Sequence, residues 1–129
     1  MLHDNPFSVL GIGNDIIEID RIRLGIKKHG VKFLDRLFTA KEQQYCLEHK
    51  DPTPRFAGRF SAKEAIVKAL GVGFGELVSW RDIEILANEK GRPVASFSEK
   101  LNLHFDHPKI LLSISHCKLY VTAVAIWIH

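Results

Sequence analysis

The spacing of apolar residues along the chain predicts mostly helices in the first half and mostly strands in the second. After a strand over 9–17, helices are predicted over 19–29, 33–38, 40–49 and 54–70. Strands are predicted over 80–86, 93–97, 110–115 and 119–128, with a short helix over 98–105. This order predicts an α+β fold in which a small antiparallel sheet packs on one long central helix.

Capping residues and helix breakers mark the expected ends of these elements. Thr39, with Glu42 three residues later, matches a capping box at the start of a helix. Thr53 is placed to cap the long helix, with Pro54 at its first position. The glycine-rich segment over 71–75 ends that helix and forms a flexible loop.

The long helix carries charged residues among positions that would otherwise pack a core. On a helical projection Arg59 and Lys63 share a stripe beside the apolar one, and Glu64 and Lys68 share another. The apolar stripe consists of Ala62, Ile66, Ala69 and Leu70. Cations beside a buried face need an anionic partner or a route to water, and this set suits a phosphate ligand with a metal ion. The alternative is a solvated charged face with an i,i+4 pair between Glu64 and Lys68.

A second carboxylate, Asp15, stands at the end of the first predicted strand, after Gly11 and Gly13. A carboxylate in that position is costly unless it is paired, solvated or bound to a metal. Asp15 and Glu64 together offer two carboxylates on two rigid elements, and one or two carboxylates commonly hold Mg²⁺ beside substrate phosphates and water. An aspartate that caps the following helix is the alternative interpretation.

Composition and charge narrow the function only slightly. The 129 residues, 46% hydrophobic and 26% charged, fit one domain over 1–129. A net charge of +3 suggests attraction to phosphates or acidic partners and does not by itself indicate nucleic-acid binding. Cys46 and Cys117 lie in no metal-binding pattern, which favours free thiols in a reducing cytoplasm. The N-terminus lacks a signal-peptide pattern and the apolar stretch over 119–128 is short, so we expect a soluble cytoplasmic protein without membrane contact.

Common nucleotide-binding motifs are absent from the sequence. Gly11 and Gly13 lack the third glycine of a dinucleotide fingerprint, and no Walker A pattern occurs. A nucleotide would therefore have to bind in another way. His116, at the tip of the last predicted hairpin, could contact a phosphate or be only an exposed turn residue.

Three sequence blocks point to a known family. They are Gly11-Ile12-Gly13-Asn14-Asp15-Ile16 through Arg21-Ile22, Gly58-Arg59-Phe60-Ser61-Ala62-Lys63-Glu64-Ala65 with Lys68-Ala69, and Ser113-Ile114-Ser115-His116 with Tyr120. In this order and spacing they resemble the holo-[acyl-carrier-protein] synthases, the short class of 4′-phosphopantetheinyl transferases. The resemblance covers nearly the whole chain. It implies transfer of 4′-phosphopantetheine from coenzyme A to a serine of apo acyl carrier protein, with release of adenosine 3′,5′-bisphosphate, for fatty acid biosynthesis.

The resemblance also implies roles for individual residues. Asp15 and Glu64 match the family's Mg²⁺ ligands, and Lys68 joins them as a catalytic residue near the transferred or leaving phosphate. The residues implied to bind coenzyme A are Arg59, Lys63, Lys68 and His116.

Partners follow from the same resemblance. Arg21 matches a basic position that docks the acidic helix of the carrier protein, and this surface extends through Arg23, Lys27 and Lys28. The family is typically a homotrimer with active sites between subunits. Val72 and Cys117 stand where the family usually has residues with a hydroxyl group, so a hydroxyl contact to the coenzyme is not expected at either position.

Two other functions stay open from the sequence. A non-enzymatic basic module that binds nucleic acid or an acidic protein would show salt-sensitive binding and would give Asp15 and Glu64 no role. A degenerate family member kept only for binding would retain the fold without the transfer reaction.

Overall fold

The computed structural model describes residues 8–129, and the expectation about a signal peptide falls largely on residues outside that range. The helices are α1 (Ile19–His29), α2 (Val31–Leu37), α3 (Ala40–Leu47), α4 (Thr53–Leu70) and α5 (Glu99–Phe105), with a 3₁₀ helix at Trp80–Asp82. The strands are β1 (Val9–Glu18), β2 (Ile83–Ala87), β3 (Pro93–Phe97), β4 (Lys109–His116) and β5 (Tyr120–Ile128). Within the described part of the chain, none of the helices has the length and apolar character needed to cross a bilayer.

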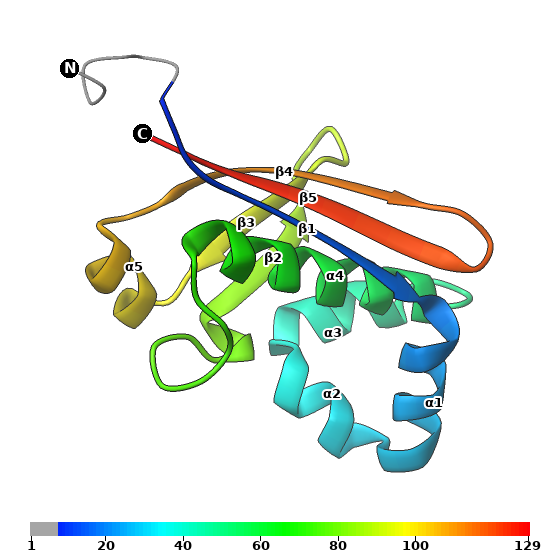
Figure 1. The fold of residues 1–129 in the computed structure, drawn as a ribbon. Coiled ribbons are helices and arrows are strands. Elements are labelled where there is room, and N and C mark those ends of the chain that lie inside the picture. Colours follow the sequence, from blue (N-terminus) through cyan, green and yellow to red (C-terminus); the bar gives the residue numbers. More distant parts are fainter. Residues whose placement is uncertain (1–7) are drawn as a thin grey trace.

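The strands form two antiparallel units around the long helix. β1, β5 and β4 form a sheet in that order, and β2 pairs with β3 in a separate hairpin. Figure 1 shows α4 running along one face of the three-stranded sheet, with α1–α3 near its N-terminal half and α5 near its other end. The α+β class and the long central helix are confirmed, although the strands divide into two sheets rather than one.

The inner face of β1 is formed by residues with almost no side chain. Successive strand residues point to opposite faces, so Gly11 and Gly13 face α4 while Ile12 is exposed on the outer side. A Cβ atom added at Gly13 would lie 2.0 Å from the Ala65 carbonyl oxygen. The backbones of β1 and α4 therefore approach closely, and Asp15, the next residue on the same face, is directed toward the helix.

Two hydrophobic clusters meet along α4. One joins its C-terminal half to the inner face of the sheet, β2 and α5, and it includes Ile66, Ile83 and Leu101. The other joins its N-terminal half to α1–α3, and it includes Phe38 and Phe56. The predicted apolar stripe, Ala62, Ile66, Ala69 and Leu70, is buried along its whole length. Because α4 packs against the sheet on one side and against other helices on another, even some of its polar residues are buried.

Most predicted boundaries agree with the structure, and the exceptions have local causes. The Thr39–Glu42 capping box is present, with the Thr39 amide donating to Glu42 Oε1 at 2.9 Å. Thr53 is the first residue of α4 rather than its cap, because Pro52 occupies the cap position.

The predicted strand over 80–86 loses its first three residues to the 3₁₀ helix. The Ser79 amide and hydroxyl both donate to Asp82 Oδ2, at 2.8 and 2.9 Å. These local bonds wind the chain into a tight turn, so β2 begins at Ile83.

Candidate active site

A pocket of about 320 Å³ opens where β1 and α1 face the middle of α4. Its polar lining is Asp15, Arg21 and Glu64, and its apolar lining includes Ile17, Phe33 and Phe60. The two acids that the sequence places on different elements therefore share one pocket. The cap interpretation of Asp15 is wrong, because Glu18 occupies the N-cap position of α1.

Two side chains of α4 contact the Asp15 carboxylate. Ser61 Oγ donates a hydrogen bond to Asp15 Oδ2 at 3.0 Å, and Lys68 Nζ lies 3.3 Å from Asp15 Oδ1. Lys68 Nζ also donates to the Asn14 carbonyl oxygen at 3.0 Å. Among residues 8–129, Lys68 thus pairs with Asp15 and makes no ion pair with Glu64. The expected alternative, an i,i+4 pair on a solvated face, is not formed.

Glu64 is half-buried in the same pocket and has no ion-pair partner within the described range. Burial raises the pKa of its carboxyl group, the charge of Asp15 raises it further, and Lys68 acts in the opposite direction. A divalent cation between two carboxylates that repel each other would stabilise both charges. Mg²⁺ fits this donor set, because it needs only one or two carboxylates when phosphate and water supply the other ligands.

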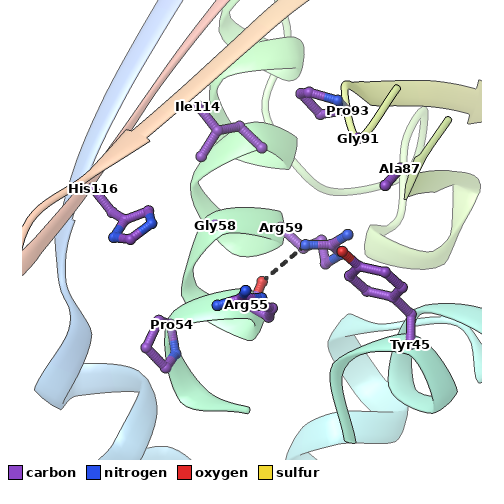
Figure 2. A pocket seen from close by; sticks show the side chains of 10 residues that line it. All are labelled: Tyr45, Pro54, Arg55, Gly58, Arg59, Ala87, Gly91, Pro93, Ile114 and His116. Atoms are coloured by element: carbon purple, nitrogen blue, oxygen red, sulfur yellow. Dashed lines mark hydrogen bonds between the residues drawn. The ribbon is translucent and has the colours of Figure 1, made fainter. Parts of the chain in front are cut away.

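A second pocket, of about 180 Å³, lies on another side of α4. Figure 2 shows Arg55 and Arg59 from α4, Tyr45 from α3 and His116 from the end of β4 around it. The Arg59 guanidinium lies 4.4 Å from the centre of the Tyr45 ring, and its Nε donates to the Ile85 carbonyl at 3.2 Å. Two guanidinium groups beside an imidazole suit a phosphate group. The structure thus brings the predicted residues Arg59 and His116 into one pocket.

Lys63 lies in neither pocket, and this corrects its expected role as a ligand of coenzyme phosphates. Its Nζ is fully buried and forms an ion pair with Glu42 Oε1 at 2.7 Å. It also donates to the carbonyl oxygens of Leu37 at 2.7 Å and Trp80 at 3.1 Å. All three donors of the ammonium group are therefore engaged inside the protein.

The predicted carrier-docking residues are spread along α1. Arg21 lines the same pocket as the two acids. Arg23 forms surface ion pairs with Asp20 at 3.5 Å and Asp51 at 3.4 Å, so part of its charge is already neutralised. The remaining members of this surface are the exposed Lys27 and Lys28.

Sequence reasoning missed three residues that contribute to these pockets: Arg55, Ser61 and Tyr45. Arg55 could have been found, because it precedes Arg59 by one helical turn and so shares its face. Ser61 lies inside a recognised block, but nothing in the sequence shows that its hydroxyl contacts Asp15. Tyr45 carries no signal at all, since its contact with Arg59 joins two helices.

Comparison with known proteins gives a consistent assignment. The sequence matches the 4′-phosphopantetheinyl transferase superfamily over residues 11–125. It is 58% identical over 118 residues to the holo-[acyl-carrier-protein] synthase of Protochlamydia amoebophila, covering 92% of this chain and 97% of that protein. The crystal structure of the Helicobacter pylori synthase in complex with coenzyme A matches with a TM-score of 0.82 and 36% identity, covering 90% of this chain and 98% of that one. The Bacillus anthracis synthase in complex with CoA (3′,5′-ADP) matches with a TM-score of 0.81 and 36% identity, covering 93% and 96%. This chain therefore belongs to the holo-[acyl-carrier-protein] synthase family of 4′-phosphopantetheinyl transferases.

Proposed function

We propose that the pocket between β1 and α4 is the reaction site of this transferase. The chain transfers 4′-phosphopantetheine from coenzyme A to a serine of apo acyl carrier protein and releases adenosine 3′,5′-bisphosphate. The serine oxygen bonds to the phosphorus nearer the pantetheine, and the bond from that phosphorus to the bridging pyrophosphate oxygen breaks. The observation that carries the proposed site is the convergence of Asp15 and Glu64, from two rigid elements, in one pocket.

We assign Asp15 and Glu64 as the residues that would hold Mg²⁺. When bound, the ion neutralises charge on the pyrophosphate oxygens. Ser61 fixes the orientation of the Asp15 carboxylate through its hydrogen bond to Oδ2. Lys68 is half-exposed at the edge of the pocket and supplies a positive charge for the leaving phosphate. Arg21, at the rim, is proposed to contact the carrier protein next to its reacting serine.

The pocket of Arg55, Arg59 and His116 is proposed to hold the nucleotide end of coenzyme A. This pocket and the pocket of Asp15 and Glu64 open on different sides of α4. A single extended ligand would have to pass around the helix to reach both pockets of one chain. We therefore infer that a neighbouring subunit supplies one of the two pockets to each active site.

The outer face of the three-stranded sheet supports assembly of several copies. Ile12, Ile16, Leu111 and Val124 expose 66%, 63%, 56% and 39% of their surfaces. Several large apolar side chains exposed on one sheet face are unusual on a monomer. We infer that it is covered in a homotrimer, and sedimentation at working concentration tests this. A fully active monomer would contradict the inference.

The direct test of function is the mass of apo acyl carrier protein after incubation with the chain, coenzyme A and Mg²⁺. We expect the carrier to gain the phosphopantetheine arm. Glu64→Gln and Asp15→Asn should abolish this gain while leaving circular dichroism unchanged, and Glu76→Gln, an exposed acid outside both pockets, serves as control. Near-normal turnover of either site variant with Mg²⁺ as the only metal would reject the site.

A mixing experiment tests whether subunits share the active site. The Glu64→Gln variant and an Arg55→Ala/His116→Ala variant should each be inactive alone. If different subunits supply the two pockets, exchange of subunits between the variants restores part of the activity, because some sites receive an intact pocket from each partner. If one chain supplies both pockets, every site keeps a defect and no activity returns.

The alternative functions are less well supported. A nucleic-acid-binding module gives no reason for a half-buried pair of acids. A family member without activity would fail the carrier-mass test even when correctly folded. The cytoplasmic location and the role in fatty acid biosynthesis remain predictions.

A further inference from the structure

Glu42 and Lys63 form an ion pair for which the transfer reaction has no obvious use. Both side chains have 0% exposure, and their charged atoms are 2.7 Å apart. Removing two charges from water is costly, and a buried pair often adds no stability over apolar residues of similar size. A function in fixing local geometry would explain why the pair is present.

The pair acts on the backbone of one residue of β2, Ile85. Glu42 Oε1 accepts hydrogen bonds from Lys63 Nζ at 2.7 Å and the Thr39 amide at 2.9 Å, and Oε2 accepts from the Ile85 amide at 2.9 Å. Among the strands that the structure describes, β2 pairs with β3 alone, along one of its edges. At its other edge, the Ile85 amide is therefore satisfied by a side chain instead of a further strand.

The backbone of the same residue also contacts Arg59, through the carbonyl group of the next peptide unit. The Ile85 carbonyl accepts a hydrogen bond from Arg59 Nε at 3.2 Å. Arg59 Nη1 donates to the Arg55 carbonyl at 3.4 Å, and the Tyr45 ring covers one face of the guanidinium. Figure 2 shows the group held in this way beside the second pocket. A shift of the Ile85 backbone would thus change the direction in which the guanidinium points.

We propose that Glu42 is a positioning residue for Arg59: its carboxylate, which Lys63 contacts at 2.7 Å, holds the Ile85 backbone so that the guanidinium meets a phosphate of coenzyme A. The inference rests on the proposed function of the second pocket. It assigns the acceptor oxygen of Glu42 an effect on coenzyme affinity rather than on the transfer step, because Glu42 does not line the pocket of the two acids.

Two double variants separate positioning from simple stabilisation. Glu42→Gln/Lys63→Met removes both charges but keeps an oxygen that can accept from the Ile85 amide. Glu42→Leu/Lys63→Met removes that acceptor as well. Leu101→Ala, a fully buried core residue on α5, controls for general destabilisation. The measured quantities are the Kd for adenosine 3′,5′-bisphosphate by calorimetry, and KM for coenzyme A and kcat by carrier mass.

We expect the Kd and KM of Glu42→Leu/Lys63→Met to rise about tenfold with little change in kcat. The glutamine variant and the Leu101 control should stay within about twofold of the wild type. If the leucine variant is folded and binds the bisphosphate normally, the positioning role is overturned. Arg59→Gln distinguishes this failure from failure of the pocket itself: if Arg59→Gln also binds normally, the proposed function of the second pocket is wrong.

A measurement on the wild-type chain covers the case in which the leucine variant does not fold. Binding of adenosine 3′,5′-bisphosphate should slow hydrogen exchange of the Ile85 amide, because a phosphate that holds Arg59 also restrains the Ile85 backbone, whose carbonyl Arg59 contacts. The Leu101 amide serves as an internal reference. Equal changes at the two amides would overturn the proposal.

Discussion

Gly13→Ala should disrupt both the fold and the candidate site, because no space exists for one methyl group between β1 and α4. The added Cβ would lie 2.0 Å from the Ala65 carbonyl oxygen, 2.7 Å from the Ala69 amide nitrogen and 2.9 Å from Lys68 Cβ. Two of these three atoms belong to the backbone of α4. The third, Lys68 Cβ, is also fixed by the backbone, so none of the three can move without a shift of the buried helix.

The geometry sets the size of the effect. Ordinary contact of a Cβ atom begins near 3.4 Å, so β1 and α4 would have to separate by about 1.4 Å at Gly13. Forcing an extra methyl group into a packed core costs about 1–3 kcal/mol, and backbone contacts place this case at or above the upper end. A loss of about 3 kcal/mol lowers the Tm of a domain this size by roughly 10 °C.

Thermal unfolding at fixed protein concentration measures this effect, and Gly58→Ala provides the matched control. Gly58 is a buried glycine within α4, but its added Cβ would meet only Ile114 Cγ2, at 3.5 Å. Because alanine favours a helix over glycine by about 1 kcal/mol, Gly58→Ala should match or exceed wild-type stability. A Gly13→Ala variant within 2 °C of the wild type would refute the close-approach argument.

The same substitution connects packing to chemistry. Asp15 follows Gly13 on the inner face of β1, whereas Glu64 lies on α4. Separation of the two elements should therefore move one carboxylate away from the other, and displacements near 1 Å can cost about 10²-fold in rate. We expect the folded fraction of Gly13→Ala to lose transfer activity as well as stability.

Three further outcomes are expected. The pKa of the Glu64 carboxyl group is higher in the folded chain than in the unfolded chain, so the folded state binds this proton more tightly. The resulting stability is fully present at low pH and is lost as pH rises through the folded-state pKa. Without metal, Glu64→Gln should therefore raise the Tm at pH 7 and have little effect near pH 4, as followed by calorimetry; a lower Tm at pH 7 would contradict the pKa direction. Arg21→Ala should weaken carrier binding most at low salt in surface plasmon resonance, while Lys109→Ala at the far end of the sheet should not; equal loss in both would remove the docking role. Burial raises the pKa of Cys46 to about 12, whereas Cys117 is exposed with a lowered pKa, so mass spectrometry after alkylation of the native chain should find one label, on Cys117.

Local signals explain why so much of the fold was predictable. The capping box at Thr39, the breaker before α4 and the glycine after it act within a few residues, so the sequence displays them directly. The pairing of Asp15 with Glu64 was predicted from their residue types on two rigid elements and from the family resemblance, which implied that both hold Mg²⁺. The close approach of β1 and α4 then explains how the two acids come to line one pocket.

Long-range partners explain what the sequence did not reveal. Lys63 was expected in a phosphate site because its position beside the apolar stripe suits a ligand-binding cation. Its actual partner, Glu42, is 21 residues away and also serves the capping box of α3. A sequence pattern can show that a buried cation needs an anion, but only the packing of α3 on α4 decides whether that anion is a ligand or a side chain.

The two acid–base pairs of α4 illustrate how burial separates structural from chemical roles. Lys63 and Glu42 are both completely enclosed, so neither can exchange its partner without opening the core. Lys68 and Asp15 have side-chain exposures of 50% and 15%, and their 3.3 Å contact is longer. Exposed pairs contribute little stability, so Lys68 can leave Asp15 for a phosphate at low cost. The residue that can change partners is therefore the one that lies at the proposed reaction site.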